Sequence, residues 1–519
     1  MSHSFDQLAV PLTNGSILAL PPVEEYAAAA LRNASINGGI LVDGEPLSTF
    51  RRQAGACAIA AAREYTLSLG LDPGPEENPS APVIGSGHQP VTFHPGVMIK
   101  PVAMVRAARR MGAAPLFITV DSDDFRAEYV LLPSMDSGRL EKIEFPLFPI
   151  KKHCLYETAV AEPPEVMLDR FEAMAGFLAH PRLERPRRAM EGYLETLRKT
   201  RLDFPDYVSR AIVTRRAWMA PDVDGFPELP VSILSRQQPF LRFARHVMAG
   251  IVRFAAEYNR ALDEYRLERK LRYPANPFPN LESGPGLIQA PFWVIESGER
   301  RKLFVRVDNG LGAALVMENR KELPMEAVLE GKVEIRPKAI TLSLYLRLAV
   351  TGLFIHGVGG ARYDHVTDAV MERYFGASPP ESACLSATLW IDVPGEDPRQ
   401  EIAEAERRIR DMEQHPEKAG AGRRGVERLA SMKEELVGEI KNPGAGKKSL
   451  GIRIRELNQQ MAALLSTERQ TLVERLETLA PVELERQAAQ ARDYPFCLYS
   501  REALLALAGP DLQQARESM

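Results

Sequence analysis

Apolar and polar residues between 81 and 125 form blocks that predict a strand, a turn, a helix and a second strand. The first apolar run starts at Val83, and the second covers 116–120. Between them, apolar residues recur at the three- and four-residue steps of one helix face, at Met98, Val102, Val105 and Ala108. This pattern predicts a βαβ unit, and we expect the rest of the chain to be organised around it.

A second unit of the same kind is expected over 336–376. A helix over 341–350 leads to a short apolar strand at 353–356, and another helix covers 361–375. The turn between that strand and the last helix holds Gly357, Gly359 and Gly360. Because glycine has no Cβ, such a turn lets a ligand approach the backbone closely.

We expect four parts in the chain: a helical lead-in over 1–78, an α/β core over 79–396 with a mainly helical insertion at about 160–285, a helical region over 397–490, and a tail over 491–519 that packs back on the core. The core should also hold strands at 127–132 and 140–145, helices at 165–178 and 187–199, one long helix at 240–270, and a hairpin of strands at 290–296 and 302–307.

From 397 onward, apolar residues at alternating three- and four-residue steps are flanked by charged ones, which predicts an antiparallel coiled coil. Breaks at 415–425 and 441–449 divide it into a hairpin or three antiparallel helices. The second break, KNPGAGKKS, is not a phosphate-binding Walker motif. Lys448 stands where that motif needs Ser or Thr, and Lys441 where it needs Gly.

The 519 residues include 65 basic and 69 acidic side chains, so neither nucleic acid nor a membrane surface is expected as a partner. The four cysteines are far apart and form no CxxC pair, which favours isolated thiols in a reducing compartment. The chain starts without a basic region followed by an apolar stretch, and no segment approaches the roughly twenty apolar residues of a membrane span. We expect a cytoplasmic protein that acts on a small molecule.

The first turn collects side chains that suit an anion. His88, Gln89, His94 and Gly96 precede or open the predicted helix, and Lys100 lies in its first turns. A helix N-terminus presents unpaired N–H groups and partial positive charge, so it is a ready place for a phosphate.

Polar residues also follow the second strand of this unit, at Asp121, Ser122, Asp123 and Asp124. They should project from the carboxyl edge of the sheet, where ligands bind in open α/β sheets. At least one of them is expected to serve only as a cap or turn residue. If the two loops meet, Asp121 or Asp123 could complete a metal site with the two histidines; the alternative is that the histidines are structural.

The glycine-rich turn has similar neighbours. His356 ends the preceding strand, and Arg362, Tyr363 and Asp364 are expected in the first turn of the helix that follows. Donors, an acceptor and a cation would then surround a turn suited to phosphate. The alternative is that the glycines only allow close packing.

The stretch GSGHQPVTFHPGVMIKPVAMVRAARR, followed by PLFITVDSDDF, resembles the nucleotidyltransferase-like domain of the bacillithiol-biosynthesis cysteine-adding enzymes. LRLAVTGLFIHGVGGARYDHVTDAVMERYFG and the predicted coiled coil are similar to later parts of that family, in the same order. The first loop also resembles the HxGH signature of the wider nucleotidyltransferase superfamily. Val97 replaces the second histidine of that signature, and His88 replaces the first glutamine of the cysteine-adding family.

The resemblance implies a Rossmann-like (nucleotidyltransferase or HUP-like) parallel sheet with helical insertions. It implies a ligase or transferase that binds an ATP- or ADP-like nucleotide and joins an amino acid such as cysteine to a small acceptor. His94 and Lys100 would neutralise charge on the transferring group, and Asp123 or Asp121 would hold Mg²⁺. Arg362, Tyr363 and Asp364 would orient the second substrate.

A homodimer through the coiled coil is the expected assembly. The alternative is a non-catalytic or paralogous nucleotide-binding protein in which the coiled coil is an interaction scaffold.

Overall fold

The computed structural model describes residues 8–34, 36, 39–76, 78, 81–273, 275–391, 393, 395, 397–440 and 446–508. The predicted KNPGAGKKS turn lies largely outside the described residues, because 441–445 are not among them. The chain divides into two compact units. The first joins 1–132, 143–391 and 492–519, and the second joins 133–142 and 392–491.

A six-stranded sheet forms the centre of the first unit, in the order β1-β16-β15-β4-β5-β8. The strands are β1 (Ser16–Leu20), β4 (Val83–His88), β5 (Ala114–Thr119), β8 (Glu228–Pro230), β15 (Leu353–His356) and β16 (Ala383–Thr388). Five of them are parallel, and β1 lies antiparallel on the edge beside β16. The inner strands read as apolar runs because both faces of the sheet are covered. The protein is therefore a mixed α/β protein with a largely parallel central sheet.

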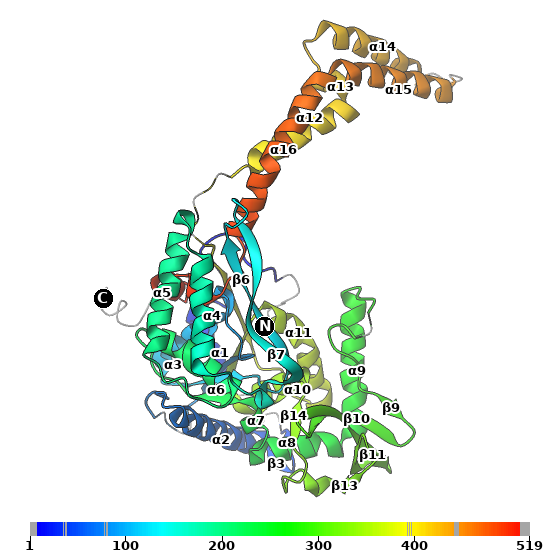
Figure 1. The fold of residues 1–519 in the computed structure, drawn as a ribbon. Helices are drawn as coiled ribbons and strands as arrows, with labels where there is room; N and C mark the ends of the chain where they lie inside the picture. The colour runs from blue at the N-terminus through cyan, green and yellow to red at the C-terminus, as the bar shows by residue number, and fades with distance from the viewer. Residues whose placement is uncertain are drawn as a thin grey trace. The chain divides into compact units, whose positions relative to one another are not determined.

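The two predicted strand–turn–helix units are neighbours in this sheet. Strand β4 pairs in parallel with β15, with Ser86 opposite Ile355. From β4 the chain passes through α3 (Pro95–Met111) to β5, and from β15 through α11 (Val358–Val370) to β16. The crossovers thus lead to opposite sides of the β4–β15 pair. Figure 1 labels the two crossover helices, α3 and α11. Such a reversal of strand order leaves a crevice at the carboxyl ends of the two strands.

Helices cover both faces of the central sheet. On one face α3 packs against α1 (Tyr26–Ala34) and α17 (Arg501–Ala506). On the other, α2 (Leu47–Ser68) packs against β8, and α11 packs against α9 (Ile251–Glu268) and α10 (Ala339–Tyr345). Most residues of the central strands β4, β5, β15 and β16 are buried. The sheet is held between two apolar layers, so the positions of its strand ends are fixed by packing.

A second, antiparallel sheet lies in the same unit, in the order β13-β12-β11-β10-β14, with β9 beside β10. Its strands are β9 (Ser283–Gly284), β10 (Leu287–Glu296), β11 (Glu299–Asp308), β12 (Leu311–Met317), β13 (Glu322–Pro324) and β14 (Ile335–Pro337). The predicted hairpin is confirmed, because β10 pairs antiparallel with β11. Ser297 and Gly298 form its turn and both have positive φ, as tight hairpin turns require.

The single helix predicted over 240–270 is wrong. The segment forms α8 (Gln238–Ala249) and α9, which are separated at Gly250. A Cβ on Gly250 would lie 2.3 Å from the Tyr374 hydroxyl, so the close approach at this junction requires glycine. The apolar periodicity continues across the break because both helices bury a face in the same core.

Several strands were not predicted or were predicted too short, among them β16 of the central sheet and β12, β13 and β14 of the second sheet. The lead-in contributes β1, and the helical insertion contributes β8, to the central sheet. The pair expected at 127–132 and 140–145 is a longer hairpin of β6 (Asp124–Ser134) and β7 (Glu141–Leu155). The remaining helices of the insertion are α4 (Pro164–Phe177), α5 (Glu184–Arg198), α6 (Tyr207–Met219) and α7 (Val231–Leu234).

The second unit is built from α12 (Arg399–Gln414), α13 (Pro416–Ala419), α14 (Arg424–Ile440), α15 (Lys447–Leu464) and α16 (Ser466–Ala489). Helices α12 and α16 run antiparallel, because ion pairs join the start of one to the later part of the other. Glu401 pairs with Arg475 at 2.6 Å, and Arg408 pairs with Glu468 at 2.6 Å. Helices α14 and α15 pack through Leu436, Leu450 and Leu457. Among the described residues, no helix has the length and apolar character needed to cross a bilayer.

Candidate functional site

The carboxyl edge of the central sheet brings together the turns that follow β4, β5 and β15. These strands are parallel neighbours or next neighbours, so His88, Thr119 and His356 end at the same edge. The side chains predicted to act chemically lie in or directly after these turns. The sheet therefore gathers three turns that are separated by up to 270 residues in the sequence.

The start of α3 is capped and enclosed. His94 is the N-cap residue, and its Nδ1 accepts a hydrogen bond from the Gly96 N–H at 3.1 Å. A Cβ on Gly96 would lie 2.7 Å from the Ala387 carbonyl oxygen, 2.8 Å from Ser386 Oγ and 2.9 Å from Arg492 Nη2. Glycine is needed at this position because the end of β16 and the returning tail meet the helix here.

Lys100 is a buried cation behind this helix start. Its side chain is 2% exposed, and Nζ donates to the Gly87 carbonyl oxygen at 2.8 Å. Burial lowers the pKa of Lys100 to about 8, so the ammonium form still predominates at neutral pH. Within the described part of the chain, Lys100 forms no ion pair. A charged lysine without an acidic partner creates a local excess of positive charge.

His88 and His94 belong to the same electropositive cluster. Burial, together with the Lys100 charge, lowers the pKa of His88 to about 3. Burial and the charges of Arg492 and Lys100 lower the pKa of His94 to about 4. Both imidazoles are therefore neutral near pH 7 and act as hydrogen-bonding groups, while the positive charge resides on Lys100 and Arg492.

Arg492 was not predicted as part of the site. Its Nη2 donates to Ser386 Oγ at 3.0 Å and contacts the Ala387 carbonyl oxygen at 3.2 Å. Its Nε is buried and has no acceptor among the described residues. A buried donor without an acceptor is costly, so this atom is available to an anion. The tail sequence predicted a return to the core, but no local pattern identifies its contact with α3.

The start of α11 is open. Gly357 is its N-cap, and a Cβ added to Gly357 or Gly359 would meet no atom within 4 Å. Helix α11 begins at Val358, so the prediction that the helix starts at Ala361 is wrong. Val358 is 7% exposed and packs in a cluster with Leu8 and Cys384. This packing outweighs the cost of about 1 kcal/mol that a glycine imposes in a helix.

Arg362, Tyr363 and Asp364 consequently lie in the second turn of α11, not in the first as predicted. In the structure, the side chains of these three residues do not come together in one site. Arg362 donates to the Leu8 carbonyl oxygen at 2.6 Å, and the Tyr363 ring lies 5.3 Å from that of Phe278. The three side chains leave α11 in different directions because residues one apart on a helix do not share a face.

Asp364 is the centre of a buried ionic network beneath the glycines. One carboxylate oxygen lies 2.9 Å from Arg347 Nη1, and the other lies 2.9 Å from His356 Nε2 and accepts from Ser382 at 2.8 Å. Although burial opposes ionisation, the charges of Arg347 and His356 hold the pKa of Asp364 well below its usual range. The network fixes α11 against the end of β15 and thereby positions Gly357 and Gly359.

The acidic segment after β5 is linked to the β4 turn. Asp123 accepts from Gln89 Nε2 at 3.0 Å and from Arg300 Nη1 at 3.1 Å, while Asp124 lies 2.8 Å from Arg300. Gln89 thus ties the two turns together. Ser122, which precedes Asp123 in the chain, is buried.

Asp121 accepts two hydrogen bonds from Ser232, from its N–H at 2.9 Å and its hydroxyl at 2.5 Å, and burial raises the pKa of Asp121 to about 6. Mg²⁺ binds through carboxylate oxygens. Both oxygens of Asp121 and of Asp123 already accept hydrogen bonds, so Mg²⁺ would have to share them with Ser232, Gln89 and Arg300. Among the described residues, no three His, Cys, Asp or Glu side chains are arranged to hold a metal ion.

Comparison of the chain with models of known protein families and with curated proteins finds no match.

Proposed function

We propose that this chain is a nucleotide-binding ligase or transferase of the cysteine-adding type, built on a Rossmann-like sheet. The observation that carries the proposal is the pairing of β4 with β15, from which the two crossovers diverge. In open α/β sheets this reversal point is where ligands bind, at the carboxyl ends of the strands. The starts of α3 and α11, which the sequence predicts to bind an anion, are both at this point.

An ATP- or ADP-like nucleotide suits the chemistry of the two helix starts. The open glycines at the start of α11 leave room for a phosphate beside the backbone N–H groups. Lys100 and the unpaired Nε of Arg492 supply positive charge and a donor on the α3 side. Phosphate oxygens would accept hydrogen bonds from both groups.

The proposed reaction joins an amino acid such as cysteine to a small acceptor. Bound ATP would supply the activating phosphoryl or adenylyl group. His88 and His94 would act as neutral hydrogen-bonding groups to the developing charge, and Lys100 would neutralise it. Preorganised donors in a site shielded from water are usually the largest contribution to such catalysis. Asp123 would hold Gln89 toward the substrate, and no step is assigned to Mg²⁺.

Calorimetry with ATP and ADP tests the site through Gly359→Val. A side chain at Gly359 would occupy open space and block the phosphate position without a clash in the protein. Gly192→Val in α5 is the matched control, because Gly192 is also helical and its Cβ would also meet no atom within 4 Å. We expect nucleotide binding to be lost only in Gly359→Val. Equal binding by both variants would remove the proposed site.

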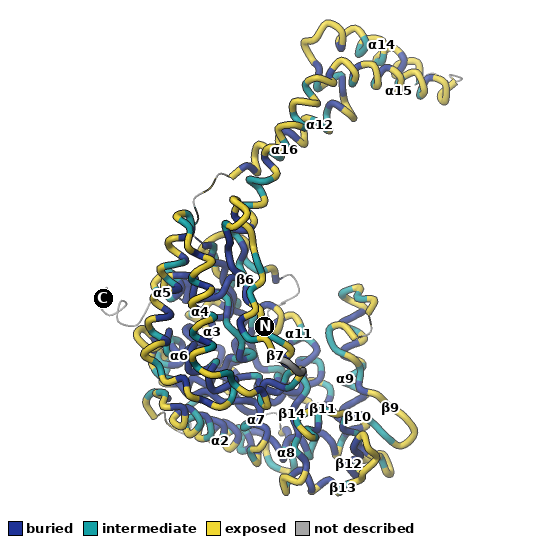
Figure 2. The backbone as a smooth tube through the Cα atoms, viewed as in Figure 1, coloured by how far each residue is buried: buried dark blue, intermediate teal, exposed yellow. Residues whose placement is uncertain are grey.

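We further propose that the second unit is an antiparallel coiled coil that joins two copies of the chain. Its helices expose large apolar side chains: Met432, Val437, Ile452, Leu464 and Leu484 are 40–63% exposed. Figure 2 shows that most other residues of these helices are exposed as well. Apolar residues at such positions are typical of helices that pair with a partner helix. Whether or not the chain is catalytic, this surface favours a homodimer.

A further inference from the structure

A cavity of about 540 Å³ lies beside α2, at the edge of the central sheet opposite the candidate site. Val83 and Gly352, which line it, are at the amino ends of β4 and β15. Because these strands are parallel, their carboxyl ends, with His88 and His356, lie at the other edge. The cavity is therefore separate from the proposed nucleotide site.

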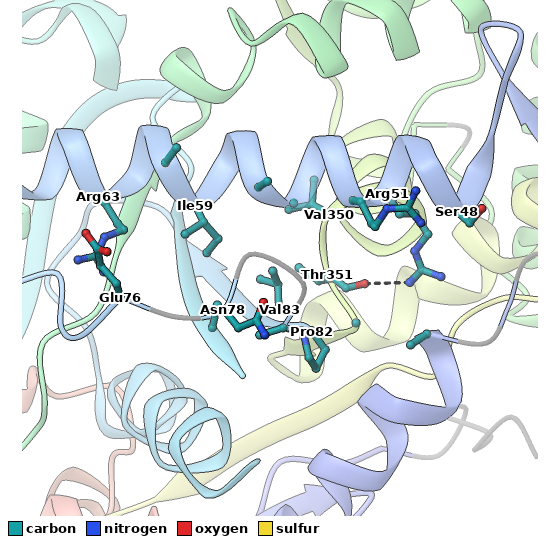
Figure 3. A pocket seen from close by; sticks show the side chains of 18 residues that line it. Ser48, Arg51, Ile59, Arg63, Glu76, Asn78, Pro82, Val83, Val350 and Thr351 are labelled. Atoms are coloured by element: carbon teal, nitrogen blue, oxygen red, sulfur yellow. Dashed lines mark hydrogen bonds between the residues drawn. The ribbon is translucent and has the colours of Figure 1, made fainter. Parts of the chain in front are cut away.

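The middle of the cavity is apolar. One face of α2 lines it with Gly55, Ala56, Ile59 and Ala60, whose spacing follows the helix repeat. Pro82, Val83 and Val350 face them from the other side, as Figure 3 shows. At Gly55 the two walls are in contact, because a Cβ there would lie 3.4 Å from the Val350 carbonyl oxygen and 3.8 Å from Val83 Cγ2. The open part of the cavity lies along Ile59 and the exposed Ala56 and Ala60, whose short side chains leave room for an apolar body.

Arginines mark both ends of the cavity. Figure 3 shows Arg51 at one end, and Arg63 beside Glu76 at the other. Arg52 also lines it, so among the lining residues that the structure describes three arginines face one glutamate. This balance favours an anionic ligand.

No carboxylate in the described part of the chain balances the charge of Arg51. Its Nη1 donates to the Asn33 carbonyl oxygen at 2.9 Å, and its Nη2 contacts the Thr351 carbonyl oxygen at 3.4 Å. Arg51 forms no ion pair among the residues that the structure describes, and its Nε has no acceptor there. Burial lowers the pKa of Arg51, yet a guanidinium stays charged at neutral pH. The backbone carbonyls thus hold the Arg51 guanidinium in place and leave its Nε as a donor for a ligand.

We propose that this cavity binds a medium-chain organic carboxylate. The chain lies along Ala56, Ile59 and Ala60, and the carboxylate meets Arg51 and the exposed Arg52. A guanidinium matches the planar geometry of a carboxylate, and cavities of roughly 300–1,000 Å³ are the usual size for small ligands. Nothing in this site depends on the nucleotide, so either could be correct without the other.

Calorimetry with octanoate on the full chain, at concentrations below micelle formation, tests the assignment. One site per chain is expected. Octanamide, which has the same chain length without the charge, should bind roughly tenfold or more weakly, because a hydrogen bond to a charged group is lost. Arg51→Gln and Arg52→Gln should each weaken octanoate binding. Arg272→Gln, at an exposed arginine that does not line the cavity, should not.

Ala56→Phe tests the place of the chain. Ala56 is exposed on α2, so a larger side chain there fills the cavity without entering the core. It should abolish octanoate binding, whereas Leu67→Phe, at an exposed position of the same helix, should leave it unchanged. Octanamide binding as tightly as octanoate, unchanged binding in Ala56→Phe, or displacement of octanoate by ATP would each overturn the proposal. Arg52→Gln and Ala56→Phe keep the test decisive if Arg51→Gln fails to fold.

Discussion

Replacing the buried lysine of the candidate site should stabilise the protein. Lys100→Met removes an ammonium group that is 2% exposed and forms no ion pair within the described residues. The depression of its pKa from 10.5 to about 8 corresponds to a penalty of about 3 kcal/mol in the folded state, at about 1.4 kcal/mol for each unit. Loss of the hydrogen bond to the Gly87 carbonyl oxygen offsets about 1 kcal/mol. We expect Lys100→Met to be about 2 kcal/mol more stable at pH 7.

The direction of the Lys100 pKa shift determines how the stability advantage of Lys100→Met changes with pH. Below the folded pKa of about 8, both the folded and unfolded states hold the Lys100 proton, and the penalty is complete. Between this value and 10.5, the folded protein releases the proton and the wild type recovers stability. The advantage of Lys100→Met should therefore shrink as the pH rises, from about 2 kcal/mol at pH 7 to about zero near pH 9.5.

Urea unfolding followed by tryptophan fluorescence is the suitable assay. The three tryptophans, Trp218, Trp293 and Trp390, all belong to the first unit, so the signal reports the unit that contains Lys100. Lys199→Met is the control, because the Lys199 side chain is 72% exposed and its ion pair with Glu195 is at the surface. It should change stability by less than about 1 kcal/mol. A destabilised Lys100→Met, or an advantage that stays constant between pH 7 and pH 9.5, would refute the reasoning.

Three further outcomes follow from the contacts. Asp364→Asn should destabilise the first unit by about 3–5 kcal/mol in the same urea assay, because the buried Arg347 loses its ion pair with the Asp364 carboxylate. His94→Ala should cost about 1 kcal/mol through the lost cap of α3, and His94→Asn should restore most of it. Val437→Glu combined with Ile452→Glu should convert a dimer to a monomer in sedimentation, since both side chains are exposed on the helical unit.

The sequence predicted three strands of the central sheet, β4, β5 and β15, because they are buried on both faces. The strand at 353–356 has the predicted bounds, and the first apolar run begins β4 at the expected residue. A continuous apolar run between turn residues is a local signal, so no knowledge of the fold is needed to find it. The pairing of these two strands is a contact between residues more than 250 positions apart. The resemblance to the cysteine-adding enzymes predicted that these strands would meet, whereas the apolar pattern did not.

The strands of the central sheet that escaped prediction are its two edge strands, β1 and β8, and the inner strand β16. β8 has three residues, and β1 lies antiparallel on the opposite edge of the sheet. Their residues form strands because a neighbouring strand offers hydrogen bonds, which no local propensity encodes. The start of α11 was misplaced for a related reason. Gly359 and Gly360 predict a turn, but the buried Val358 ahead of them fixes the backbone as helix.

Arg492 shows why the candidate site could not be completed from the sequence. It follows the long excursion through the helical unit, and it reaches Ser386 and the backbone near Gly96, almost 400 residues earlier in the chain. Glycine at 96 makes room for this contact, so the same residue that suggested an open phosphate cradle in fact accommodates a protein side chain. The start of α3 is therefore closed and positively charged, whereas the start of α11 is open and neutral. In the proposed complex a nucleotide would approach from α11, and Lys100 and Arg492 would act on it from the α3 side.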